Sequence, residues 1–198
     1  MQTKRAIAYI IDLLLITSIL MILFYILPSD LKAQKIQTKI DQIGEEYASG
    51  EMDKMTYFMT LSSLEKDLDQ KQAFEIVIDS VLIVIYFIIV PYIWNGFTVG
   101  KRIMNLKIVS NENKKVRLMS LFIRAFIMDG LLASLLIIFG IYVIDESFYL
   151  SFVSILAILQ LLSLIVSYFM IKYRRDLKGL DDILSHSKVV KINEGSEL

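Results

Sequence analysis

Four charged side chains lie inside long apolar stretches of this sequence: Asp12, Asp79, Arg124 and Asp129. Insertion scales assign about 2.5–3.5 kcal/mol to such a charge, so each one needs a partner or water. Arginine can hold a carboxylate through two parallel hydrogen bonds. A carboxylate in an apolar site can instead bind and release a proton or a cation. The chemistry available to these residues is therefore ion pairing or reversible ion binding.

Depth along the predicted helices suggests which charges meet. Arg5 and Asp12 share one helical face, because seven residues are nearly two turns. Asp12 then lies about 10 Å deeper than Arg5. Arg124 follows the start of its own apolar run by six residues, which gives it a similar depth. We therefore expect Arg124 to pair with Asp12, and Asp129, about 140° around the helix from Arg124, to face another neighbour or a central cavity.

This cluster has three interpretations. It is an ion pair that fixes helix packing, an ion- or proton-linked site, or a set of charged side chains that reach water and have no particular role. The sequence has no cysteine and one histidine, which excludes a thiolate metal site, a cysteine nucleophile and any site that needs two histidines. We expect neither enzymatic activity nor a cofactor.

Four apolar runs must position these residues: 6–27, 76–93, 118–144 and 148–171. A bilayer span needs about 20 mostly apolar residues. The composition agrees, since 56% of the residues are hydrophobic, against about 45–50% in soluble domains, and the mean hydropathy is +0.59. The sequence predicts an all-α membrane protein with four transmembrane helices and a single domain over 1–198.

Loop charges predict the orientation of these helices. The loop 94–117 carries six basic residues against Glu112 alone, whereas the segment 28–75 carries six basic and ten acidic residues. Because basic loops stay in the cytoplasm, we expect a multi-pass membrane protein with cytoplasmic N- and C-termini. The net charge of zero gives no sign of a nucleic-acid partner.

The segment 28–75 is predicted to be an extracytoplasmic helical insertion. Ile36, Ile40, Ile43 and Tyr47 recur at helical spacing, and the pattern breaks at 48–50 before a second apolar stripe begins. The segment is either a self-packed cap or a partner-binding face rich in methionine.

A small cytoplasmic β-patch is predicted between the second and third spans. Residues 106–109 and 116–118 flank a turn signal at 111–113, which is typical of a short hairpin. Residues 189–192 could add a strand.

The residues that follow the second span form a motif at the membrane interface. They are Trp94, Gly96, Thr98, Gly100, Lys101 and Arg102. The glycines are expected to turn the chain, and the two basic side chains to meet anionic headgroups of the lipid bilayer. Trp94 is typical of an interfacial anchor.

Four segments together carry a family resemblance. They are Arg5-x2-Ala8-x3-Asp12, residues 94–102 followed by 106–109, Arg124, and residues 179–190. In this order they resemble the RDD family of small bacterial membrane proteins, named for an arginine and two aspartates. The resemblance implies that Asp182 is the second aspartate. Asp181 stands where the family commonly has histidine, Ser187 replaces threonine, and the long segment 28–75 is an addition.

The resemblance implies membrane transport, the role usually suggested for the family. The favoured hypothesis is a small transporter or ion exchanger that uses a charge cluster on the cytoplasmic half. The cluster comprises Arg5, Asp12, Arg124, Asp129 and Asp182. It would carry a small ion or solute, and four spans are few for a transporter, so a homo-oligomer is expected. The alternative is a regulatory or scaffolding membrane protein that binds another protein.

Overall fold

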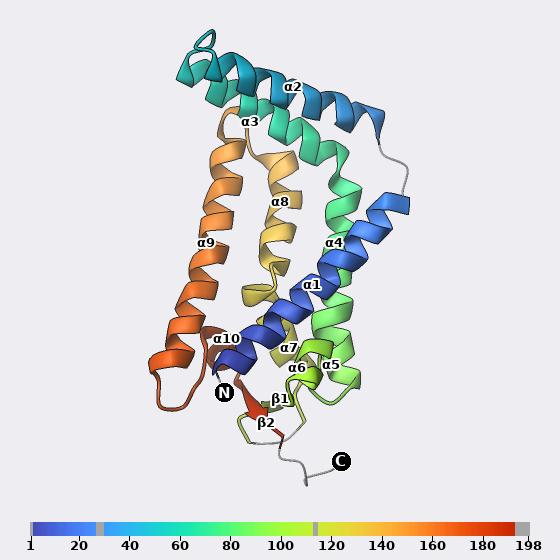
Figure 1. Cartoon of the computed structure of the whole chain (residues 1–198), viewed down its shortest axis with the longest axis vertical. Helices are drawn as coiled ribbons and strands as arrows, with labels where there is room; N and C mark the ends of the chain where they lie inside the picture. Colours follow the sequence, from blue (N-terminus) through green and yellow to red (C-terminus); the bar gives the residue numbers. More distant parts are fainter. Residues whose placement is uncertain (1, 27–29, 113–114, 193–198) are drawn as a thin grey trace.

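The computed structural model describes residues 2–26, 30–112 and 115–192. The molecule is mostly helical, with long helices side by side and a helical hairpin across one end (Figure 1). The helices are α1 (Gln2–Ile26), α2 (Leu31–Ala48), α3 (Lys54–Lys71), α4 (Ala73–Val84), the π-helical turn η1 (Ile85–Ile89), α5 (Val90–Ile93), α6 (Val99–Ile103), α7 (Leu118–Met128), α8 (Leu131–Val143), α9 (Glu146–Tyr173) and α10 (Leu180–Leu184). The strands are β1 (Leu106–Ser110) and β2 (Ser187–Lys191).

Three continuous helical stretches among the described residues are long and apolar enough to cross a membrane: Gln2–Ile26, Ala73–Ile93 and Glu146–Tyr173. They correspond to the first, second and fourth predicted spans. The third predicted span is not one straight helix, because α7 and α8 are bent by 64° against each other. The bent pair makes a fourth span if it is counted as one.

The break between α7 and α8 lies at Asp129 and Gly130. Gly130 has φ +83°, a left-handed conformation that glycine adopts without the steric penalty of a side chain. The Ser134 hydroxyl donates to the Gly130 carbonyl at 3.2 Å, so a side chain satisfies a backbone group near the break. Irregular backbone at membrane depth is tolerated where it lies within protein or lines a cavity.

The two strands lie at the end of the molecule where α1 begins, together with α6 and α10 (Figure 1). We call this the sheet end. β1 pairs antiparallel with β2, with Leu106 opposite Lys191 and Ser110 opposite Ser187. The predicted pairing of 106–109 with 116–118 is therefore wrong. The reason is that α10 packs against α7 and leads into β2, which lies beside β1, whereas residues 116–117 lead directly into α7. Of the predicted turn, residue 113 lies outside the described residues.

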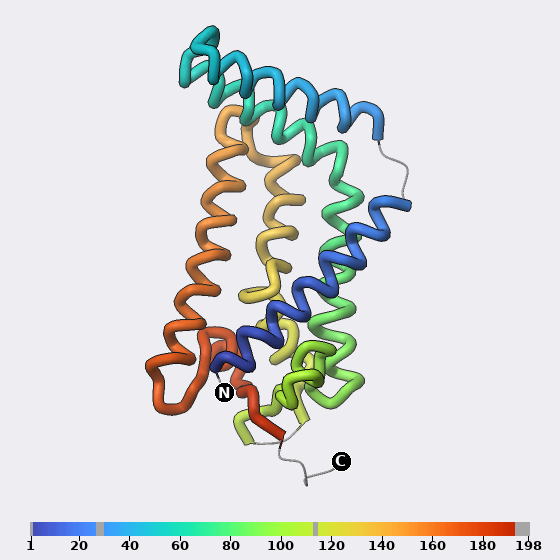
Figure 2. The backbone as a smooth tube through the Cα atoms, in the orientation of Figure 1, coloured from blue at the N-terminus to red at the C-terminus, as the bar shows by residue number. Residues whose placement is uncertain are grey.

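The opposite end, which we call the hairpin end, carries α2 and α3 across the tips of the long helices (Figure 2). They are the helical hairpin predicted for 28–75, of which residues 28 and 29 lie outside the described residues. The Tyr149 hydroxyl donates to Asp69 at 2.6 Å, and Lys66 donates to the Ile144 carbonyl at 2.8 Å. These bonds tie α3 to α9 and to the end of α8.

The buried core lies toward the sheet end, between α1, η1, α7 and the strands. Its members include Ala8, Tyr86, Ile108, Leu121 and Ala125. By contrast, α9 leaves large apolar side chains exposed along most of its length. Such a surface suits a helix that faces lipid, because a soluble protein rarely exposes contiguous apolar patches of this extent.

Candidate functional site

Asp12 is fully enclosed between α1, η1 and α6. Its Oδ1 accepts hydrogen bonds from the Tyr86 hydroxyl at 2.5 Å and the Gly100 backbone N–H at 2.7 Å. Its Oδ2 accepts from the Thr98 hydroxyl at 2.6 Å. The Lys101 Nζ lies 3.7 Å from Oδ2. Both carboxylate oxygens are therefore held by donors from the motif that follows the second span.

Small residues permit this close approach. A Cβ on Gly100 would overlap the Ala8 carbonyl oxygen and the Asp12 side chain. Gly96 has φ +98°, and a Cβ there would overlap the Ile108 carbonyl oxygen. The segment 5–12 of α1 and the segment 94–102, which we call the glycine motif, therefore pack directly against each other. Ala8 and Gly100 are the points of contact.

A second buried group surrounds Asp182 on α10. Arg5 lies 2.6 Å from its Oδ2, and Arg124 lies 2.5 Å from its Oδ1. Arg124 also reaches Asp181 at 2.5 Å and the Ser187 hydroxyl at 3.0 Å. Burial opposes the charge of Asp182, but the attraction of Arg124 and Arg5 and their hydrogen bonds hold its pKa below the usual value. One carboxylate therefore links α1, α7 and α10.

The predicted pair between Arg124 and Asp12 is wrong. α10 brings Asp181 and Asp182 against the Arg124 guanidinium, while α6 covers Asp12 with neutral donors. The sequence-based interpretation did not include Asp181 in the site, although it lies beside the family aspartate. The available signal was the pair of adjacent carboxylates, Asp181 and Asp182, because one arginine guanidinium has five donors and can bind both of them.

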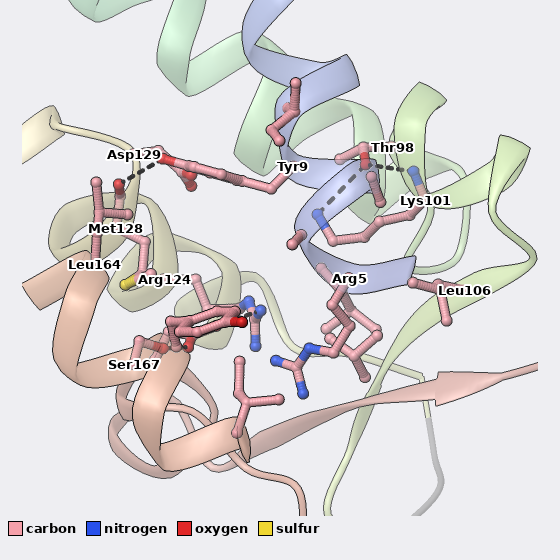
Figure 3. Close-up of a pocket in the computed structure, with 18 of the residues that line it drawn as sticks. Arg5, Tyr9, Thr98, Lys101, Leu106, Arg124, Met128, Asp129, Leu164 and Ser167 are labelled. Atoms are coloured by element: carbon pink, nitrogen blue, oxygen red, sulfur yellow. Dashed lines mark hydrogen bonds and ion pairs between the residues drawn. The ribbon is translucent and has the colours of Figure 1, made fainter. Parts of the chain in front are cut away.

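A cavity of about 260 Å³ lies between the two buried groups. Its walls are mostly apolar, and its polar side chains include Arg5, Tyr9, Lys101, Arg124, Asp129 and Asp181. Figure 3 shows Arg5 and Arg124 on one side of this space, with Asp129 and Lys101 farther along it. The lining also includes Ile10 of α1 and Tyr168 of α9, which are both exposed on the flank of the molecule. The mouth of the cavity therefore lies between α1 and α9.

Asp129 differs from the other predicted site aspartates because its carboxylate has no hydrogen bond and no ion pair with any described residue. The neighbouring Met128 carbonyl, freed at the end of α7, accepts from the Tyr9 hydroxyl at 3.0 Å and from the Gln160 amide at 2.8 Å. The backbone at the break is thus satisfied by α1 and α9. The Asp129 carboxylate remains in the cavity wall.

Lys101 is the other cavity group with weak contacts. Its ammonium lies 3.4 Å from the Thr98 hydroxyl oxygen, in addition to its longer contact with Asp12. Burial of the ammonium lowers the pKa of Lys101, while the Asp12 carboxylate acts in the opposite direction. Within the described ranges, no group of three or more His, Asp or Glu side chains is placed to hold a metal ion.

Trp94 and Arg102 lie away from the cavity, on the surface at the sheet end. The Arg102 guanidinium lies 5.8 Å from the centre of the Trp94 ring. Lys115 lies over Tyr92 at 5.0 Å, and Lys107 over Phe97 at 5.4 Å. These cation–aromatic pairs suit a membrane interface, where rings and cations meet headgroups.

Comparisons with known proteins identify a family for this chain. A sequence model described as the RDD family matches residues 2–186. The uncharacterized protein YckC of Bacillus subtilis (strain 168) is 29% identical over 118 residues, which are 60% of this chain and 62% of that relative. The chain therefore matches a little under two thirds of that relative's length. No solved structure matches the chain.

Proposed function

This chain belongs to the RDD family, a membrane-associated family, and from its buried charges we propose that it is a small transporter or ion exchanger of the bacterial cytoplasmic membrane. The observation that carries the proposal is the break in the third span. It leaves the Asp129 carboxylate in a cavity wall without a bond to the described residues. Transporters commonly place substrate sites at such discontinuous helices.

The buried charges divide into two roles in this proposal. Asp12 and Asp182 are saturated with donors, so they hold α6 and α10 against α1 and α7. Asp129 is the carboxylate that remains available to a transported ion or solute. Substitution of Asp12 would disturb the fold together with any flux, so Asp129 is the better residue for a test.

Orientation is part of the same proposal. The basic loop 94–117 and the cation–aromatic pairs lie at the sheet end, which favours a cytoplasmic sheet end and cytoplasmic termini. The cavity would then open within the cytoplasmic half of the membrane. With three or four spans per chain, we expect the transporter to work as a homo-oligomer.

The proposal is tested in reconstituted vesicles that hold an internal pH-sensitive dye and carry a sodium or potassium gradient. Asp129→Asn should reduce the cation-driven pH change to that of protein-free vesicles. Asp79→Asn is the matched control, because Asp79 lies on α4 outside the cavity lining, and it should keep the flux. Equal flux in the wild type and in folded Asp129→Asn protein would contradict the proposal.

A second candidate function is that of a regulatory or scaffolding partner of another membrane protein. It is favoured by Met55, Phe58 and Met59, which lie on one side of α3 and are exposed. Deletion of 32–71 should then remove a co-purifying protein while the spans stay folded. Retention of every partner after the deletion would contradict this alternative.

A further inference from the structure

Two charged groups of opposite sign in the cavity wall, Lys101 and Asp129, make few polar contacts with the described residues. The guanidiniums of Arg5 and Arg124 are held by Asp182 and Asp181 at 2.5 to 2.6 Å. The Lys101 ammonium has three donors and makes two polar contacts with the described residues, at 3.4 and 3.7 Å. The Asp129 carboxylate makes no hydrogen bond with the described residues.

These two groups lie on different walls of the same space. Figure 3 shows Lys101 reaching in from α6 on one side and Asp129 at the end of α7 on the other, with Tyr9 between them. They belong to different elements, and no salt bridge between them occurs in the part of the chain that the structure describes. A ligand that contacts both needs a cationic and an anionic group in one molecule.

The size and lining of the cavity argue against a bare ion as its only occupant. A volume of about 260 Å³ is many times the roughly 10–15 Å³ that a cavity needs, in the same measure, to hold one water. Ala6, Ile10, Leu164 and Ile171 supply apolar surface from α1 and α9. A small organic molecule with an apolar part fills such a space better than a hydrated cation does.

We propose that the cavity binds a small zwitterion, with its ammonium group at Asp129, its carboxylate or phosphate at Lys101 and its apolar part against α1 and α9. The inference rests on the proposed transport function and names the substrate class for the same site. A zwitterion of this kind has two sources. A free amino acid would enter from water, and a phosphatidylethanolamine headgroup would enter from the leaflet through the mouth between α1 and α9.

The first arm of the test uses free solutes and purified full-length protein. L-leucine should raise the thermal unfolding temperature, because a ligand that binds only the folded state stabilises it. Leucine amide, which lacks the anionic group, and 4-methylpentanoate, which lacks the ammonium group, should each give little or no rise. Asp129→Asn and Lys101→Met should each lose the leucine effect, while the surface control Lys107→Met keeps it.

The second arm uses lipid nanodiscs. Native mass spectrometry should find phosphatidylethanolamine retained on the wild type in preference to phosphatidylglycerol, which lacks the ammonium group. The preference should disappear in Asp129→Asn. Selectivity in the first arm identifies a free solute, and selectivity in the second identifies the headgroup.

The inference is overturned if neither arm distinguishes the zwitterion from its singly charged counterparts, or if Asp129→Asn keeps the selectivity. Its failure can be separated from failure of the proposed function. Zwitterion binding without flux of either the zwitterion or a cation contradicts transport and leaves the site standing. Cation flux that depends on Asp129, without zwitterion binding, supports transport and overturns the assigned substrate class.

Discussion

At the scale of single residues, Asp12 and Asp182 are both carboxylates with no exposed surface, but they are neutralised in different ways. Asp12 is held by a tyrosine, a threonine and a backbone N–H, with a lysine at longer range. Asp182 is held by two arginines. Hydrogen bonds from neutral donors fix the geometry of a carboxylate, whereas a pair of arginines also balances its charge.

Gly100→Ala tests the contact between the glycine motif and α1. The new Cβ would overlap the Ala8 backbone oxygen, so the variant should lose about 1–3 kcal/mol of unfolding free energy. Gly44→Ala is the matched control, because its Cβ meets nothing within 4 Å in a helix, and it should gain about 0.5–1 kcal/mol. Chemical denaturation of both variants in detergent gives the comparison, and a neutral Gly100→Ala would contradict the close approach.

The loss of stability caused by Asp182→Asn should depend on pH in a defined direction. Because the folded-state pKa of Asp182 is lowered, the charged form stabilises the fold above the unfolded pKa of about 3.9, and this contribution is lost as pH falls through the lower folded value. At neutral pH the substitution should cost about 3 kcal/mol, near the low end for a broken buried pair, since Asp181 still holds Arg124.

The measurement is the difference in unfolding temperature between wild type and Asp182→Asn from pH 7 to pH 3. That difference should shrink below about pH 4. A constant difference across this range would show that the charge of Asp182 does not stabilise the fold.

At the scale of elements, the apolar runs were predictable because a bilayer span needs an uninterrupted length of apolar residues. The break at Asp129 and Gly130 was not predicted, because the apolar run 118–144 is otherwise continuous and a run of that length indicates a single span. An aspartate followed by glycine was the available signal. A strand at 189–192 was expected only as an addition to a local hairpin, whereas β2 is itself the partner of β1 among the described residues. The direct pairing was missed because the two strands are far apart in the sequence and a local hairpin was the nearer alternative.

Gly130→Ala tests whether the break is built into the third span. A Cβ on Gly130 meets nothing within 4 Å, but the φ of +83° is strained for alanine, so the expected cost is about 1–2 kcal/mol. The same substitution at Gly44 should raise the free energy of unfolding, so measurements on the two variants together test the strain at Gly130. Unchanged stability in Gly130→Ala would mean that the backbone relaxes into a straighter span.

At the scale of the whole molecule, the buried charges lie toward the sheet end and a separate set of bonds holds the hairpin end. Sequence reasoning named Arg5, Asp12, Arg124, Asp129 and Asp182 as one cluster. The structure divides them into two bonded groups and one open carboxylate around a cavity. The division was not predicted, because it depends on how α10 folds back against α7, and Arg124 and Asp182 lie 58 residues apart in the sequence.

Tyr149→Phe tests how the hairpin end is attached. Loss of the hydroxyl that donates to Asp69 at 2.6 Å should cost about 1.5–3 kcal/mol, as for a hydrogen bond to a charged group. Hydrogen exchange should increase in α2 and α3 but not in α6 or α10. Tyr142→Phe is the control, because Tyr142 is 70% exposed. Equal hydrogen exchange of α2 and α3 in the two variants would contradict the role of the Tyr149–Asp69 bond in holding the hairpin end.

The link from Asp182 to Arg5 and Arg124 also bears on how the protein is made. The ribosome synthesises Arg5 and Arg124 before residue 182, so α1 and α7 exist before the carboxylate that joins them. Until α10 has been made, each arginine needs water or another anion as its partner. The clamp between α1, α7 and α10 is therefore one of the last contacts that the growing chain can form.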